Sequence, residues 1–220
     1  MIKENLAIVR KNIPSDVTLV AVSKTKPNSS ILEAHEEGQR IFGENKVQEC
    51  VEKQEALPKD IKWHLIGHLQ TNKVKYIAPF IELIHAVDSF KLLKEINKQA
   101  KKNKRTIDCL LQFHIAQEES KFGLSFVEAQ ELLSTPEFIE LQNISITGVM
   151  GMATFTDNEE QVREEFQALE NYFNVIKSHF FKFNDAFETI SMGMSGDYQL
   201  AIEEGSTMVR VGSSIFGGRN

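Results

Sequence analysis

Two lysines follow the first strongly apolar run of the chain. The run covers residues 17–23 (VTLVAVS), and Lys24 and Lys26 come directly after it. Short runs rich in β-branched residues are typical of buried strands, so Lys24 is expected at the carboxyl end of a strand. Partial desolvation and a second cation nearby favour the neutral amine, which is the form that makes Schiff bases. The alternative is a strand-end lysine whose aliphatic stem lets it reach solvent.

Two loops rich in glycine and hydroxyl groups lie much later in the sequence. One is SMGMSGD (191–197), which carries Ser195; the other begins at Arg210 and continues with Gly212 and Ser213. Glycine allows close backbone approach, hydroxyls donate hydrogen bonds, and helix N-termini attract anions. Such loops are ordinary turns more often than phosphate sites. A phosphate site together with a lysine amine would indicate a phosphorylated aldehyde or ketone as the ligand.

Short apolar runs alternate with amphipathic segments along the whole chain. The expected strands cover residues 17–23, 40–42, 62–66, 82–87, 107–113, 144–150, 187–191 and 208–211. The expected helices lie in residues 1–13, from after the cap residues 28–30 to about 37, after 45, at 74–77, after 89, after 125, at 158–180 and at 198–204. Residues Asn28–Ser30, Asp88–Ser89 and Ser125 are candidate N-caps. In the longest helix one apolar stripe is formed by Val162, Phe166, Leu169, Phe173 and Ile176.

This alternation predicts parallel strands joined by right-handed crossovers. Eight such units make a (β/α)8 barrel, which needs about 200 to 250 residues, and the chain has 220. An open doubly wound sheet is the competing fold. No linker interrupts the sequence, so residues 1–220 are expected to form one domain. In a barrel, Lys24 and both loops would meet at the C-terminal mouth, where active sites of this fold lie.

Composition argues against several classes of protein. A net charge of −6 disfavours a nucleic-acid-binding protein, and no stretch approaches the roughly 18 apolar residues of a membrane span. The N-terminus lacks the features of a secretory leader. Two cysteines, Cys50 and Cys109, cannot build a disulfide framework, which indicates a cytoplasmic protein. His64 and His68 have the spacing of a zinc motif without its glutamate, so no metal site is predicted.

Seven segments resemble the pyridoxal phosphate homeostasis proteins, also called the YggS or PROSC family. The segments are VAVSKTKP, FGENKVQE, WHLIGHLQTNK, ESKFG, TGVMGMA, SMGMSGD and VRVGSSIFGGR. They follow one another in order across nearly the whole chain. The resemblance implies a TIM barrel like the N-terminal domain of alanine racemase, of PLP fold type III, without the C-terminal β domain. It also implies that pyridoxal 5′-phosphate (PLP) is held as a Schiff base.

The resemblance assigns roles to particular residues. Lys24 would hold the cofactor, and Arg210 would face its pyridine nitrogen. The phosphate would be bound by Ser195, Gly212 and Ser213. The pocket would be lined by Asn45, His68 and Met150.

The sequence departs from the family pattern at two of its positions. Lys46 stands where relatives usually carry tyrosine, which brings a charge to the rim of the pocket. Ser213 stands where they usually carry threonine, which keeps the hydroxyl. Lys121 belongs to the ESKFG motif, and its contact with the cofactor is a further hypothesis.

An arginine beside the pyridine nitrogen makes PLP a weak electron sink. A chain of 220 residues also has no room for the second domain that supplies a base in racemases. The resemblance therefore implies a monomeric PLP-binding protein that buffers, carries or delivers the cofactor, with apo-enzymes as candidate recipients and little catalysis of its own. A PLP-dependent amino-acid racemase with a base from a partner is one alternative. A Schiff-base aldolase that acts on a phosphorylated sugar without a cofactor is another.

Overall fold

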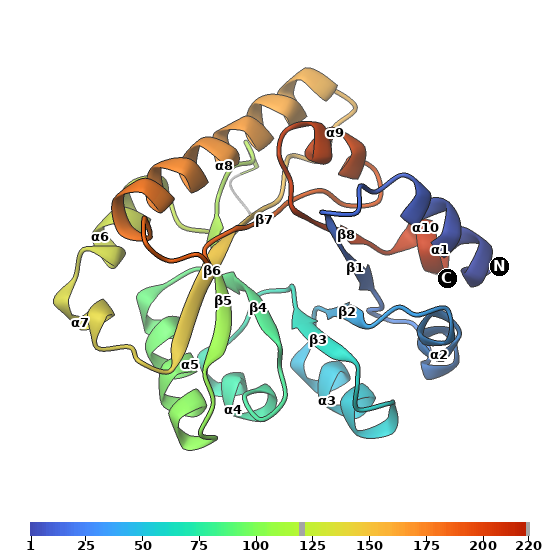
Figure 1. Ribbon diagram of the computed structural model, residues 1–220, viewed down its shortest axis with the longest axis horizontal. Coiled ribbons are helices and arrows are strands. Elements are labelled where there is room, and N and C mark those ends of the chain that lie inside the picture. Colours follow the sequence, from blue (N-terminus) through green and yellow to red (C-terminus); the bar gives the residue numbers. More distant parts are fainter. Residues whose placement is uncertain (119–121, 219–220) are drawn as a thin grey trace.

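Eight parallel strands form a closed barrel in the computed structural model, which describes residues 1–118 and 122–218 (Figure 1). The strands follow one another around the barrel in sequence order, and β1 also pairs with β8. Their bounds are β1 Thr18–Val22, β2 Ile41–Glu44, β3 Lys62–Leu65, β4 Leu83–Val87, β5 Ile107–Phe113, β6 Ile144–Gly151, β7 Thr189–Ser191 and β8 Met208–Val211. The barrel prediction is confirmed, and the open sheet is wrong.

Helices surround the barrel (Figure 1). Their bounds are α1 Ile2–Lys11, α2 Asn28–Glu36, α3 Val47–Ala56, α4 Val74–Ile77, α5 Phe90–Lys102, α6 Phe126–Leu133, α7 Pro136–Ile139, α8 Glu159–Phe180, α9 Tyr198–Glu203 and α10 Ser213–Phe216, with a 3-10 turn at Thr71–Lys73. The sequence did not predict α7 and α10, which are only one turn long. None of the helices in the described residues is long and apolar enough to cross a membrane.

Capping side chains fix several helix starts. Ser125 accepts a hydrogen bond from the Glu128 N–H and forms a full capping box with that residue. Ser89 accepts from the Leu92 N–H at the start of α5. The expected cap at Asn28–Ser30 is wrong, because α2 already begins at Asn28, directly after the extended residue Pro27. Pro27 is the N-cap residue of α2, and no side chain at this position accepts a hydrogen bond from the first turn.

The core has an outer and an inner part because successive strand side chains point to opposite faces. The outer part packs the barrel against the helices, and the expected stripe of α8 is buried there. The inner part is a small apolar cluster made of Val20, Leu83, Ala86, Leu110, Met150 and Met208. Nearer the carboxyl ends of the strands, the barrel interior carries hydrogen-bonded polar side chains instead, among them His85, Ser191 and Arg210. Arg210 also lines the cavity described next.

Candidate functional site

A cavity of about 690 Å³ lies at the mouth of the barrel, where the carboxyl ends of the strands meet. Its wall includes residues within about three positions of the ends of β1, β2, β7 and β8. Seven of the eight residues assigned by the resemblance line it, namely Lys24, Asn45, His68, Ser195, Arg210, Gly212 and Ser213. The fold thus brings together side chains that are up to about 190 residues apart in sequence.

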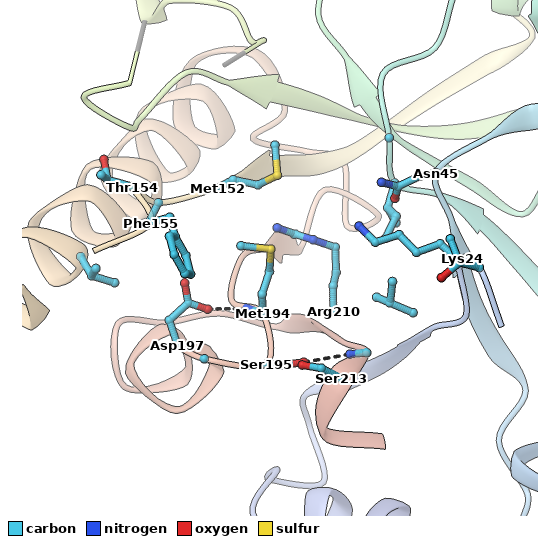
Figure 2. A pocket seen from close by; sticks show the side chains of 18 of the residues that line it. Lys24, Asn45, Met152, Thr154, Phe155, Met194, Ser195, Asp197, Arg210 and Ser213 are labelled. Atoms are coloured by element: carbon cyan, nitrogen blue, oxygen red, sulfur yellow. Dashed lines mark hydrogen bonds between the residues drawn. The ribbon is translucent and has the colours of Figure 1, made fainter. Parts of the chain in front are cut away.

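Lys24 lies two residues beyond the end of β1, and its side chain points into the cavity (Figure 2). Lys26 also lines the cavity, but its ammonium donates to the carbonyl oxygens of Gly217 and Gly218 at 3.0 and 2.8 Å. These bonds tie Lys26 to the segment after α10. The Lys24 side chain points into the cavity instead, which makes Lys24 the candidate for a lysine that reacts with a ligand.

The two Gly-Ser loops meet on the side of the cavity formed by β7 and β8. The backbone N–H of Gly212 donates to the Ser195 hydroxyl at 3.0 Å, which joins the loops directly (Figure 2). A Cβ atom at residue 212 would lie 3.1 Å from the Val22 carbonyl oxygen, so glycine lets β8 end close against β1. Because α10 has only four residues, anion binding here would depend on hydroxyls and N–H groups rather than on a helix dipole.

Arg210 is 4% exposed and is held by two strands. Its Nη1 donates to the Ser191 hydroxyl at 2.6 Å, and its Nη2 donates to the Gly151 carbonyl oxygen at 3.0 Å. Burial lowers the pKa of the guanidinium to about 10, which still leaves it charged at neutral pH. The structure thus places a fixed positive charge in the cavity wall.

Two buried histidines continue this network across the barrel. His85 Nδ1 lies 3.0 Å from the Ser191 hydroxyl, and His85 Nε2 lies 3.0 Å from His64 Nδ1. Because β4 and β7 are not neighbours, the contact between His85 and Ser191 crosses the interior. Burial lowers the pKa of His64 to about 3. The pKa of His85 is also well below its usual value, mainly because of burial and further because His64 and Arg210 lie nearby. Both imidazoles are therefore neutral at pH 7.

Asn45 and His68 form the wall on the side of β2 and β3. His68 Nδ1 lies 2.9 Å from Asp88 Oδ2, and its ring stacks on Phe122 with the centroids 4.1 Å apart. A Cβ atom at Gly67 would lie 2.7 Å from the Asn45 carbonyl oxygen. Glycine at position 67 therefore lets the loop after β3 pack directly against Asn45.

Comparison with known proteins gives the family. The sequence model of the protein family "Alanine racemase, N-terminal domain" matches residues 1–220. A pyridoxal phosphate homeostasis protein of Aquifex aeolicus is 41% identical over 203 residues, which cover 91% of this chain and 86% of that protein. One from Haemophilus influenzae is 37% identical over 233 residues, which cover 100% of this chain and 96% of that protein. The chain belongs to the pyridoxal phosphate homeostasis protein family.

Solved structures agree with this membership. PipY of Synechococcus elongatus, solved without PLP, has a TM-score of 0.92 at 34% identity and covers 99% of this chain and 100% of its own. The same protein solved with PLP bound has a TM-score of 0.88. Alanine racemase of Bartonella henselae has a TM-score of 0.73 at 17% identity and matches over only 58% of its own length. That last similarity shows the barrel fold alone.

Two residues singled out in this member of the pyridoxal phosphate homeostasis family lie away from the cavity wall, and a third is not described. Met150 is absent from the cavity wall, because it faces the inner apolar cluster of the barrel, and Met152 lines the cavity instead. Lys46 is exposed at the N-cap of α3 and does not line the cavity either. Lys121 lies outside the described residues.

Sequence reasoning missed Gln112, which also lines the cavity of this family member. Gln112 is 3% exposed, and its Nε2 donates to the Phe122 carbonyl oxygen at 3.0 Å. Its Oε1 is buried and has no hydrogen-bond partner within the part of the chain that the structure describes. An unpaired buried acceptor is costly, so a ligand hydroxyl or N–H group would satisfy it. Its place one residue before the end of a predicted buried strand, as a polar residue that follows apolar ones, was the available signal.

Proposed function

We propose that this protein binds PLP in the cavity, holds it covalently through Lys24, and serves in intracellular PLP homeostasis. The observation that carries the proposal is that Lys24 shares one cavity with Arg210 and the joined loops of Ser195 and Gly212. The family membership and the PLP bound to PipY support it. We further propose that residues 1–220 act as one domain and as a monomer in the cytoplasm.

The residues present fit this cofactor. PLP carries two groups that matter here. Its aldehyde condenses with an amine and releases one water, and its phosphate dianion accepts hydrogen bonds. Lys24 provides the amine, while Ser195, Ser213 and the loop N–H groups provide donors for the phosphate. Arg210 keeps its proton and its charge, so it disfavours protonation of a ring nitrogen that lies next to it. Gln112 offers the free acceptor described above.

We propose that catalysis is weak or absent. Arg210 is held by Ser191 and Gly151 and cannot accept a proton, so it cannot act as an acid or base. The residues that hold the cofactor would then store it for PLP-dependent apo-enzymes. An observation that favours the alternative, a racemase-like enzyme, is the pairing of His68 with Asp88 at the cavity wall, because this arrangement is typical of a general base.

Purified protein incubated with PLP should develop visible absorbance. Borohydride should bleach that absorbance and leave a pyridoxyl mass on the peptide that contains Lys24. Lys24→Ala should abolish the label, while Lys46→Ala, which removes an exposed lysine, should retain it. A protein that takes up no PLP would refute the proposed function. Racemisation of free amino acids that is lost in Lys24→Ala would favour the enzyme over the carrier.

A further inference from the structure

A buried ionic cluster lies beside the cavity, between β1, β2 and α3. The Lys53 ammonium is 2.8 Å from Glu44 Oε1, 2.6 Å from Glu49 Oε1 and 2.8 Å from the Ser23 carbonyl oxygen. An ammonium has three protons, so these three acceptors satisfy it completely. The side chain of Glu44 is fully buried, and that of Lys53 is 6% exposed.

The cluster contacts the residue on each side of Lys24. The Ser23 hydroxyl donates to Glu44 Oε1 at 2.5 Å, and Lys53 donates to the Ser23 carbonyl oxygen. On the other side, the Thr25 N–H donates to Glu49 Oε1 at 2.6 Å. Lys53, which bonds to both glutamates, links the two ends. The three-residue segment that carries Lys24 is therefore fastened at both ends to one network.

The backbone of this segment is strained. Thr25 has a φ of +64°, a left-handed conformation that β-branched residues rarely adopt. The Lys26 N–H closes a turn onto the Ser23 carbonyl oxygen at 3.0 Å, and a turn with positive φ at its third residue normally has glycine there. Such a conformation persists only where the surroundings enforce it, and strain of this kind is concentrated at functional sites.

The ionic cluster is buried although none of its three charged side chains lines the cavity. Neither Lys53 nor the two glutamates line the cavity, and Glu44 Oε2 is buried without a partner among the described residues. Burying ions costs free energy that their attraction often fails to recover. A purely structural salt bridge between α3 and β2 would require neither the bond to Thr25 nor the left-handed turn.

We propose that Glu49, Lys53 and Glu44 are positioning residues for Lys24. They hold the turn at Thr25 in its left-handed form, and this turn directs the Lys24 amine into the cavity. The inference rests on the proposed function, in which Lys24 is the residue that holds PLP. It adds that the amine is presented by a network outside the cavity and not by contacts with the cofactor alone.

The test compares Glu49→Ala and Glu49→Gln with Glu52→Ala, an exposed glutamate of the same helix. Glutamine keeps an acceptor oxygen for the Thr25 N–H but loses the charge, whereas alanine loses both. Two quantities are measured for each folded variant. The first is the affinity for PLP from visible absorbance. The second is the rate at which acetic anhydride modifies Lys24 in cofactor-free protein, read by peptide mass spectrometry relative to the exposed Lys46.

We expect Glu49→Ala to weaken PLP binding at least tenfold and to change the Lys24 acetylation rate at least threefold. Glu49→Gln should recover most of both, and Glu52→Ala should match the wild type. Equal values in Glu49→Ala and Glu52→Ala would overturn the inference, as would equal losses in the alanine and glutamine variants, which would indicate a salt bridge only. If wild-type protein took up no PLP, the proposed function would fail, while the acetylation rates would still decide whether the network positions Lys24.

Discussion

The neutral His64 inside the barrel should make the protein lose stability in mild acid. Its pKa is about 3 in the folded state and about 6.5 in an unfolded chain. The unfolded state therefore binds the proton first, and the contribution of His64 to stability is complete above about pH 6.5 and falls as the pH drops toward 3. Linkage gives a loss of about 2 kcal/mol at pH 5 relative to pH 7.5. His85 acts in the same direction.

The perturbation is His64→Gln, which removes the titrating ring but keeps a side chain that can form a hydrogen bond. The free energy of unfolding of cofactor-free protein is measured by urea titration at four pH values from 7.5 to 5.0. The fluorescence of Trp63 is a suitable probe, because it is the single tryptophan, is 2% exposed and adjoins His64 on β3. His179→Gln, which replaces an exposed histidine of α8, is the matched control.

The quantity that decides is the stability difference between wild type and His64→Gln. It should shrink by about 2 kcal/mol between pH 7.5 and pH 5.0, because only the wild type loses the His64 contribution. Burial raises the pKa of Glu44, which opposes acid unfolding, but that effect is common to both proteins and cancels in the difference. The same comparison with His179→Gln controls for the general effect of replacing a histidine by glutamine. A difference between wild type and His64→Gln that stays constant with pH would refute the assignment of a neutral, buried imidazole.

Three further outcomes follow from the site and the core. Ser195→Ala and Ser213→Ala should each weaken PLP retention about 10- to 100-fold, since a hydrogen bond to a charged group contributes about 1.5–3 kcal/mol, with the circular dichroism spectrum unchanged; full retention would refute the phosphate site. Gly67→Ala should cost about 1–3 kcal/mol in a urea titration and also weaken PLP binding, because its Cβ would lie 2.7 Å from the Asn45 carbonyl oxygen. Phe166→Ala should cost about 3–5 kcal/mol by the same titration, because Phe166 is fully buried on the inner face of α8; a loss below 1 kcal/mol would contradict that packing.

The sequence predicted the strands well because barrel strands are covered on both faces and form short, continuous apolar runs. The errors lie at their ends. Residues from 187 were expected in β7, but the strand begins at Thr189. Phe187 instead stacks on Phe173 and Phe181, with ring centroids 5.0 and 4.5 Å away. An apolar residue just outside a strand has the same local pattern as one inside it, so only the tertiary contact distinguishes them.

The network behind Arg210 could not be predicted from spacing along the chain. His64 was considered with His68, four residues on, but its partner is His85, and the bond from His85 to Ser191 spans 106 residues. Contacts across a barrel interior join residues at arbitrary separations. The family resemblance found seven residues that line the cavity but not Gln112 or Met152, whereas the groups that hold those residues, such as Lys53 and Ser191, became visible only in three dimensions.

The pairing of β1 with β8 also sets the order of events during synthesis. Roughly 190 residues separate the end of β1 from the start of β8. At typical rates of 5–20 residues per second, a ribosome needs about 10–40 s to make that stretch. Until then Lys24 has no facing loops, and β1 lacks one of its two neighbours. An unpaired strand edge is prone to pair with other chains, so the nascent protein exposes the edge of β1 to such pairing until the last strand of the barrel has been made.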